Sequence, residues 1–257
     1  DKPDLKGREA ILKVHSRKIL LDKDVDLTLI ARKTIGFSGA DLANLMNEAA
    51  LLAARKNKQS VTMAELEEAS DRVWAGPEKK SRVLSEKDKL RVAYHEGGHA
   101  VVNKFLPGTD PVHKITILQR GRTMGVTMVM PTEDKYHMTK QEYINHITMS
   151  MGGRAADVIV GGIVDTGAGG DIASATRMAH EYVCKFGMSE KLGLVNWGGD
   201  SQEVFLGRDF MKEKNYSEET ARMIDAEVKS IIDAAYNKAC EILRKNRKFL
   251  DFVAKTL

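Results

Sequence analysis

Two histidines and a glutamate stand close together in the segment His95-Glu96-Gly97-Gly98-His99. On an α-helix, residues four apart lie on the same face, so both imidazoles can reach a single metal ion. Glu96 lies about 100° around the helix from His95, where its carboxylate can contact water at the metal without binding the metal. The spacing H-E-x-x-H is typical of zinc-dependent peptide hydrolysis, because zinc activates water and a nearby carboxylate can accept the proton.

The surrounding sequence favours a helix here. Residues 85–106 carry apolar side chains at helical spacing, Ser85 is a suitable N-cap, and Pro107 ends the pattern. Gly97 and Gly98 each reduce helix stability by roughly 1 kcal/mol, which indicates that another element or a substrate approaches the backbone closely. Histidines can also be purely structural, but the chain has only seven of them, so a chance match is the weaker explanation.

The third metal ligand is not part of this motif. A catalytic zinc usually takes three protein ligands and leaves a fourth position for water. The longer pattern H-E-x-x-H-x-x-G-x-x-H is excluded, because Val102 and Phe105 occupy its glycine and third-histidine positions. The acidic candidates elsewhere are Asp157, Asp165 and Asp171. Asp171 begins a predicted helix, where an aspartate is most often only a cap, so spacing alone leaves the choice open.

The composition limits the number of domains and the classes of partner that the protein can have. With 257 residues and 42% hydrophobic content, the chain can form one large or two modest domains. A net charge of +4 from dispersed residues does not indicate a nucleic-acid partner. Cys184 and Cys240 lie far apart, as is typical of a reducing compartment. We find no membrane-length apolar run and no signal peptide, and the start at Asp1 suggests a fragment of a longer protein whose anchor would lie outside it.

The periodicity predicts a mainly α fold in two parts. Residues 1–75 form a helical bundle, with helices expected at residues 7–18, 26–32, 38–56 and 62–74. Residues 76–84 contain Gly, Pro and clustered charges and are expected to be a linker. Residues 85–257 form a mostly helical domain with a small β-sheet. Its predicted elements after the first helix are a hairpin of strands 112–118 and 124–130, and helices at 139–160, 171–186 and 217–252, with breaks near Gly152-Gly153 and Asn246.

Several motifs, taken in order, resemble the carboxy-terminal part of an FtsH-type ATP-dependent zinc metalloprotease of peptidase family M41, the group that includes the mitochondrial inner-membrane AAA proteases. They are KGRE at residues 6–9, GFSGADL at 36–42, NEAA at 47–50, YHEGGHA at 94–100, GGRAA at 152–156 and TGAGGD at 166–171. The first three resemble the small lid subdomain of the AAA ATPase, and the others resemble the zinc-peptidase domain. The chain departs from the family pattern at Ile35, Gly97 and Val158, none of which is an implied ligand.

The resemblance implies specific roles for residues of this chain. Asp171 becomes the third zinc ligand beside His95 and His99, and Glu96 becomes the catalytic base. Asp157 is a candidate to orient one of the ligand histidines.

The resemblance also implies that the lid contacts adenosine through His15, Gly39 and Ala40. The alternative is that these are ordinary residues of the lid helices, and we favour it for this chain. No G-x-x-x-x-G-K-[ST] phosphate-binding loop occurs, so we expect ATP binding in the full-length protein and no ATP hydrolysis by this chain.

The implied function is the endopeptidase part of a membrane-anchored, ATP-dependent protease that degrades unfolded or misassembled proteins as a homohexamer. Its full-length form would sit at a bacterial or organellar inner membrane, held by segments absent here, and this fragment would be soluble. One alternative is a catalytically silent ring-forming scaffold. Another is a helical nucleic-acid-binding protein, which the modest charge disfavours.

Overall fold

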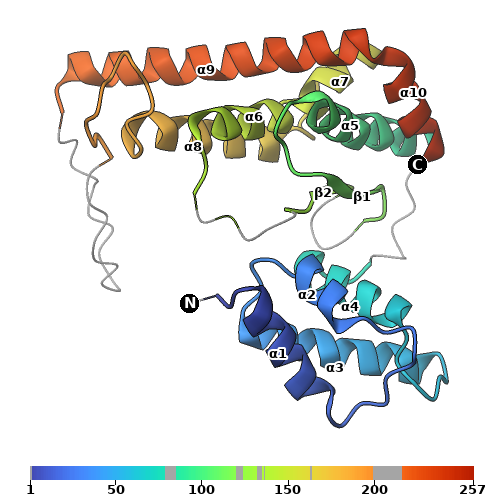
Figure 1. Cartoon of the computed structure of the whole chain (residues 1–257). Coiled ribbons are helices and arrows are strands. Elements are labelled where there is room, and N and C mark those ends of the chain that lie inside the picture. Colours follow the sequence, from blue (N-terminus) through green and yellow to red (C-terminus); the bar gives the residue numbers. More distant parts are fainter. Residues whose placement is uncertain are drawn as a thin grey trace, which may run out of the picture. The chain divides into compact units, whose positions relative to one another are not determined.

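A computed structural model of the chain describes residues 2–78, 85–119, 124–131, 135, 137–162, 164–198 and 216–257. Helices dominate the described residues, with one two-stranded sheet, which confirms the predicted mainly α class (Figure 1). The chain divides into two compact units, Asp1–Val92 with Asp110–Tyr136, and Ala93–Thr109 with His137–Leu257. The predicted domain boundaries at residues 75 and 84 stay a prediction. Within the described ranges, no helix is long and apolar enough to cross a lipid bilayer.

The first unit contains the four predicted helices, α1 (Leu5–Ser16), α2 (Leu27–Lys33), α3 (Gly39–Arg55) and α4 (Met63–Ala75). Short polar side chains begin each of them. Ser38 and Asp41 form a capping box at the start of α3, and Thr62 and Glu65 form another at the start of α4. The apolar faces of the helices meet in one core that includes Leu12, Ile30, Leu42, Leu45, Met46 and Leu66.

A buried acid joins α3 to α4. The side chain of Glu65 is fully buried and forms ion pairs with Lys56 at 2.8 Å and Lys58 at 2.9 Å. Burial alone raises the pKa of this carboxyl group, but hydrogen bonds from Lys56, Thr62 and Lys58 outweigh that effect and lower the pKa to about 2. Glu65 is therefore ionised in the folded protein at neutral pH.

The predicted hairpin is present within the same unit. Strands β1 (Val112–Thr116) and β2 (Val126–Val129) pair antiparallel, and both are shorter than the pattern predicts. An irregularity between Val112 and Lys114 shifts the register. Lys114 forms an ion pair with Asp71 of α4. Most of the predicted turn at residues 119–122 lies outside the described residues.

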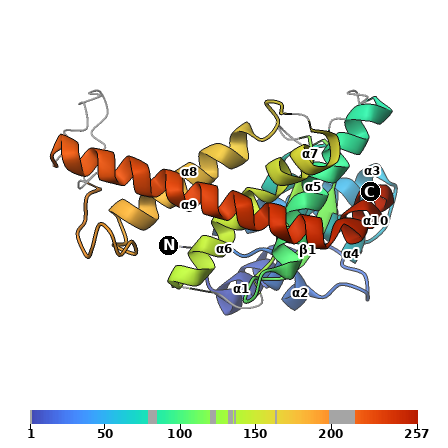
Figure 2. The same cartoon turned by 90° about the horizontal axis from the view of Figure 1, so that it is seen from above.

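The second unit is built from helices around the C-terminal part of α5 (Glu86–Phe105). The others are α6 (Lys140–Ser150), α7 (Gly152–Gly161), α8 (Gly169–Cys184), α9 (Glu218–Lys245) and α10 (Arg247–Thr256). The long helix α9 lies along α6, α7 and α8 (Figures 1 and 2).

Two predicted breaks in this unit are confirmed. The expected helix 139–160 divides at Met151 into α6 and α7, and the expected helix 217–252 divides at Asn246 into α9 and α10. Several boundaries differ from the prediction by two to four residues, and the start of α8 is the one that bears on the site. Helix α8 begins at Gly169, so Asp171 lies inside its first turn rather than at its start. The backbone of the glycine-rich stretch continues directly into the helix.

Candidate metal centre

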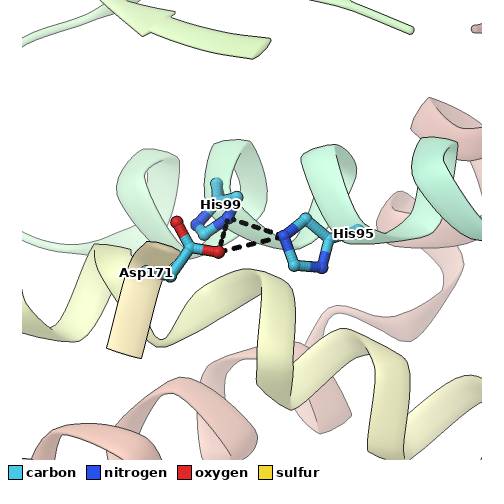
Figure 3. Close-up of side chains that lie close together, drawn as sticks. All are labelled: His95, His99 and Asp171. Atoms are coloured by element: carbon cyan, nitrogen blue, oxygen red, sulfur yellow. Dashed lines mark hydrogen bonds and ion pairs between the residues drawn. The ribbon is translucent and has the colours of Figure 1, made fainter. Parts of the chain in front are cut away.

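Three side chains from two helices converge at one point. His95 and His99 lie on α5, and Asp171 lies in the first turn of α8 (Figure 3). Oδ2 of Asp171 is 3.1 Å from Nε2 of His95 and 3.5 Å from Nε2 of His99, and the two Nε2 atoms are 3.3 Å apart. Among the residues that the structure describes, these three form the group of His, Cys or acidic side chains able to hold a metal ion.

The spacing of these three atoms fits a zinc ion. Zinc binds imidazole nitrogen and carboxylate oxygen at about 2.0–2.1 Å, so the ligand atoms of a tetrahedral site lie about 3.4 Å from one another. The three separations, 3.1, 3.3 and 3.5 Å, fall around that value. Two imidazoles and one carboxylate are also a donor set that suits zinc.

Asp157 determines which nitrogen of His95 faces this point. Its Oδ2 lies 2.9 Å from Nδ1 of His95, across from α5 to α7. Because a carboxylate accepts hydrogen bonds, Nδ1 carries the proton and donates it to Asp157. The lone pair needed for a metal then belongs to Nε2, which is the nitrogen that faces Asp171.

A backbone carbonyl group fixes the proton of His99 on Nδ1 in the same way. Nδ1 of His99 lies 2.8 Å from the carbonyl oxygen of Met149, the last residue but one of α6. A carbonyl oxygen only accepts, so Nδ1 of His99 is the donor and Nε2 is left with its lone pair. The amide of Gly153 also lies 3.3 Å from this Nδ1, but a protonated Nδ1 cannot accept from it, and we assign the bond to Met149.

The charges around His95 favour a cation. Burial lowers the pKa of His95, but its hydrogen bonds to Asp157 and Asp171 outweigh burial and raise the pKa to about 10. Burial raises the pKa of Asp171, yet its hydrogen bonds to His95 and His99 hold that pKa well below the usual range. The two carboxylates therefore favour positive charge at this point, and a bound metal ion would take the place of the proton on Nε2 of His95.

Glycines allow the helices to approach this closely. A Cβ atom at Gly153 would lie 2.5 Å from Nε2 of both His95 and His99, in the space between the imidazoles. A Cβ atom at Gly98 would lie 2.4 Å from the carbonyl oxygen of Gly152. The prediction that another element approaches the glycines of the motif is confirmed at Gly98, where that element is α7. The sequence marks the pair at 152–153 as a helix break and as part of a family motif, but it does not reveal the role of Gly153 between the imidazoles.

The remaining site candidates lie as follows. Glu96 is buried on α5, with 8% of its surface exposed. Asp165 lies in the loop before α8, where it accepts a hydrogen bond from the amide of Gly167, and it is not part of the three-residue group. Asp157 contacts Nδ1 of His95 rather than the side that faces Asp171.

The predicted adenosine contacts lie in the first unit. His15 is exposed near the end of α1, and Gly39 and Ala40 open α3 behind the Ser38 cap. Their part in nucleotide binding stays a prediction.

Comparisons with known proteins agree with this geometry. The model of peptidase family M41 matches residues 82–257, and the model of the AAA+ lid domain matches residues 24–68. The ATP-dependent zinc metalloprotease FtsH 1 of Thermoanaerobacter sp. (strain X514) is 56% identical over 255 residues, which cover 99% of this chain and 42% of that protein. FtsH 3 of Symbiobacterium thermophilum is 52% identical, and FtsH of Pseudothermotoga lettingae is 51% identical, each over 100% of this chain and 41% of the relative.

The chain thus spans about two fifths of the length of these relatives. The two family models match it in the same order as the motifs of the sequence analysis. This chain belongs to the FtsH-type peptidase family M41, and its peptidase part follows an AAA+ lid domain.

Proposed function

We propose that this chain is a zinc-dependent endopeptidase. The observation that carries the proposal is the convergence of His95, His99 and Asp171, whose ligand atoms all lie within 4.8 Å of one another. The names of its relatives, which are zinc metalloproteases, support the choice of metal and of reaction.

In this proposal Nε2 of His95, Nε2 of His99 and a carboxylate oxygen of Asp171 hold the zinc. Bound zinc supplies Lewis acidity, which polarises a peptide carbonyl and makes water more acidic. Asp157 and the carbonyl of Met149 keep the protons of the two imidazoles on Nδ1, so that neither ring can turn its lone pair away.

Glu96 is the proposed proton carrier. It follows His95 directly on α5, and only 8% of the residue's surface is exposed. We assign it to accept a proton from the attacking water and to return that proton to the amine that leaves when the peptide bond breaks.

For the whole protein, we propose an ATP-dependent protease anchored in a bacterial or organellar inner membrane. Unfolded or misassembled polypeptides are its substrates, and a homohexamer is its assembly. ATP would bind mainly to a nucleotide-binding subdomain that this chain does not contain, with His15, Gly39 and Ala40 as lid contacts. Family membership and the AAA+ lid match support this assignment.

A ring-forming scaffold without catalysis is the second candidate. The full set of His95, Glu96, His99 and Asp171 argues against it, because a silent peptidase has no need to keep a buried acid beside an assembled metal site.

The test is cleavage of unfolded casein by the zinc-loaded chain, with and without a chelator. Glu96→Gln should still bind zinc, and its cleavage rate should be at least about 100-fold lower than that of the wild type. Glu86→Gln, at an exposed position in the first turn of the same helix, is the matched control and should cleave normally. A zinc-loaded wild-type chain that cannot cleave would favour the scaffold, and full activity of Glu96→Gln would remove Glu96 from the mechanism.

A further inference from the structure

Helices α5 and α7 meet at one very close contact. A Cβ atom at Gly98 would lie 2.4 Å from the carbonyl oxygen of Gly152, and a Cβ atom at Gly152 would lie 2.8 Å from the carbonyl oxygen of Gly98. Crossing angles between helices are normally set by side-chain ridges that fit into grooves. The contact spans one turn of α7, because a Cβ atom at Gly98 would also lie 2.6 Å from Cβ of Ala156. A contact of one turn without large side chains fixes the distance between the two helices more firmly than their angle.

A second connection between the same helices runs through α10. The hydroxyl of Tyr94, on α5, donates to Oδ1 of Asp251 at 2.9 Å. Nε of Arg247 donates to the same oxygen at 2.9 Å, and Nη1 of Arg247 donates to the carbonyl oxygen of Ile159, on α7, at 3.2 Å. The Arg247–Asp251 pair therefore links α5 to α7.

The hydrogen bond between His95 and Asp157 lies between these two connections. Along α7, Asp157 comes after Gly152, at the close contact, and before Ile159, at the second connection. At 1.5 Å per residue, Asp157 is about 4.5 Å from the middle of the contact between Gly152 and Ala156, so a rotation of about 15° there would move it by roughly 1 Å. Such a shift is enough to break the 2.9 Å bond to Nδ1 of His95.

We infer that Tyr94, Asp251 and Arg247 form a positioning network that fixes the angle between α5 and α7 and so keeps Asp157 on His95. This inference rests on the proposed zinc-peptidase function. None of the three residues is a proposed metal ligand. Tyr94 lies on α5 next to His95, Arg247 holds the Ile159 carbonyl of α7, and Asp251 joins the two side chains. The C-terminal helix α10 is thereby a part of the metal-site architecture.

The network orients the two helices α5 and α7 and adds little to the stability of the fold. The Arg247 and Asp251 side chains are 40% and 33% exposed, and exposed ion pairs of this spacing contribute little to the free energy of unfolding. Loss of the network should therefore alter the metal site more than the overall stability.

Tyr94→Phe tests the inference, because it removes only the hydroxyl. Tyr143→Phe is the matched control, since the Tyr143 hydroxyl donates to Glu181 at 2.8 Å near the end of α8 opposite to Asp171, and that bond involves neither α5 nor α7. With a fluorescent peptide substrate, we expect Tyr94→Phe to lower kcat about three- to tenfold and to leave KM within about twofold. The visible absorption spectrum of the cobalt(II)-loaded protein, which reports ligand geometry, should also change. Tyr143→Phe should leave kcat and the spectrum as in the wild type.

Two substitutions of Asp251 separate geometry from charge. Asp251→Asn keeps an oxygen that can accept from Tyr94 and should stay within about twofold of the wild-type kcat, whereas Asp251→Ala should match Tyr94→Phe. Unchanged kcat and cobalt spectra in Tyr94→Phe and Asp251→Ala would overturn the inference, as would an equal loss in Tyr143→Phe. A wild-type chain that neither binds metal nor cleaves peptide would instead refute the proposed function.

Discussion

Nδ1 of His95 lies 2.9 Å from Oδ2 of Asp157, and this hydrogen bond joins the helix of the H-E-x-x-H motif to α7. The bond fixes both the tautomer and the orientation of the imidazole, so that Nε2 faces Asp171 at 3.1 Å. The proposed metal site is therefore assembled from α5, α7 and α8, and it includes residues outside the motif.

Asp157→Ala should weaken zinc binding about 10- to 100-fold, because His95 would lose the partner that holds its proton on Nδ1. Competition with a chromogenic chelator measures the affinity. Asp233→Ala, which removes an exposed acid of α9, is the control and should bind zinc as the wild type does. Equal affinities of Asp157→Ala and the wild type would show that Asp157 does not orient His95.

Gly153→Ala should abolish zinc binding, because the added methyl group would lie 2.5 Å from Nε2 of both histidines, in the space between them. Metal analysis after gel filtration gives the result directly. If Gly153→Ala retained one zinc per chain, the close packing of α7 against the imidazoles would not be needed for the site.

Gly97→Ala should be tolerated, in contrast to Gly153→Ala. Its methyl group would meet the flexible end of Leu250 at 3.3 Å, and alanine favours a helix over glycine by up to about 1 kcal/mol. We expect the free energy of unfolding, measured in urea, to change by no more than about 1 kcal/mol. A larger loss of stability would mean that α10 cannot move by the few tenths of an ångström required.

Glu65 should make the first unit sensitive to acid. Its pKa is lowered from 4.5 to about 2 in the folded protein, so its stabilising effect is present above pH 4.5 and is lost as the pH falls toward 2. Glu65→Gln should flatten the decline in stability between pH 5 and pH 3. The fluorescence of Trp74, on α4, follows unfolding of this unit in a Trp197→Phe background.

Glu67→Gln is the control for this experiment, because Glu67 also lies on α4 but its side chain is 48% exposed. It should leave the pH dependence unchanged. Parallel pH profiles for Glu65→Gln and the parent protein would show that the buried ion pairs of Glu65 do not govern acid unfolding.

Removal of zinc should destabilise the second unit selectively. A ligand present at 100 times its dissociation constant stabilises the folded state by about 2.7 kcal/mol. Dialysis against a chelator should therefore lower the unfolding midpoint reported by Trp197, and restored zinc should raise it again. The midpoint reported by Trp74 should not move, and a common shift of both signals would contradict a metal site confined to the second unit.

Local sequence signals predicted most of the helices because their causes are local. Ser38 with Asp41, and Thr62 with Glu65, begin α3 and α4 where the pattern places them, and Asn246 ends α9 as expected. The predicted start of α8 was wrong by two residues, because Gly169 and Gly170 are helical here despite the low helix propensity of glycine.

The site was predictable only in part. The spacing of His95 and His99 identifies one face of one helix, but the choice among Asp157, Asp165 and Asp171 depends on how α7 and α8 pack, which spacing does not encode. The family resemblance supplied Asp171. The role of Gly153 depends on a contact between distant segments and carries no local signal beyond the glycine pair itself.

X-ray diffraction from crystals of the zinc-loaded chain, with data collected on both sides of the zinc absorption edge, tests the central claim most directly. We predict one anomalous peak per chain, at about 2.0–2.2 Å from Nε2 of His95, Nε2 of His99 and a carboxylate oxygen of Asp171. A zinc peak elsewhere, or a zinc held by the two histidines with Asp171 turned away, would contradict it.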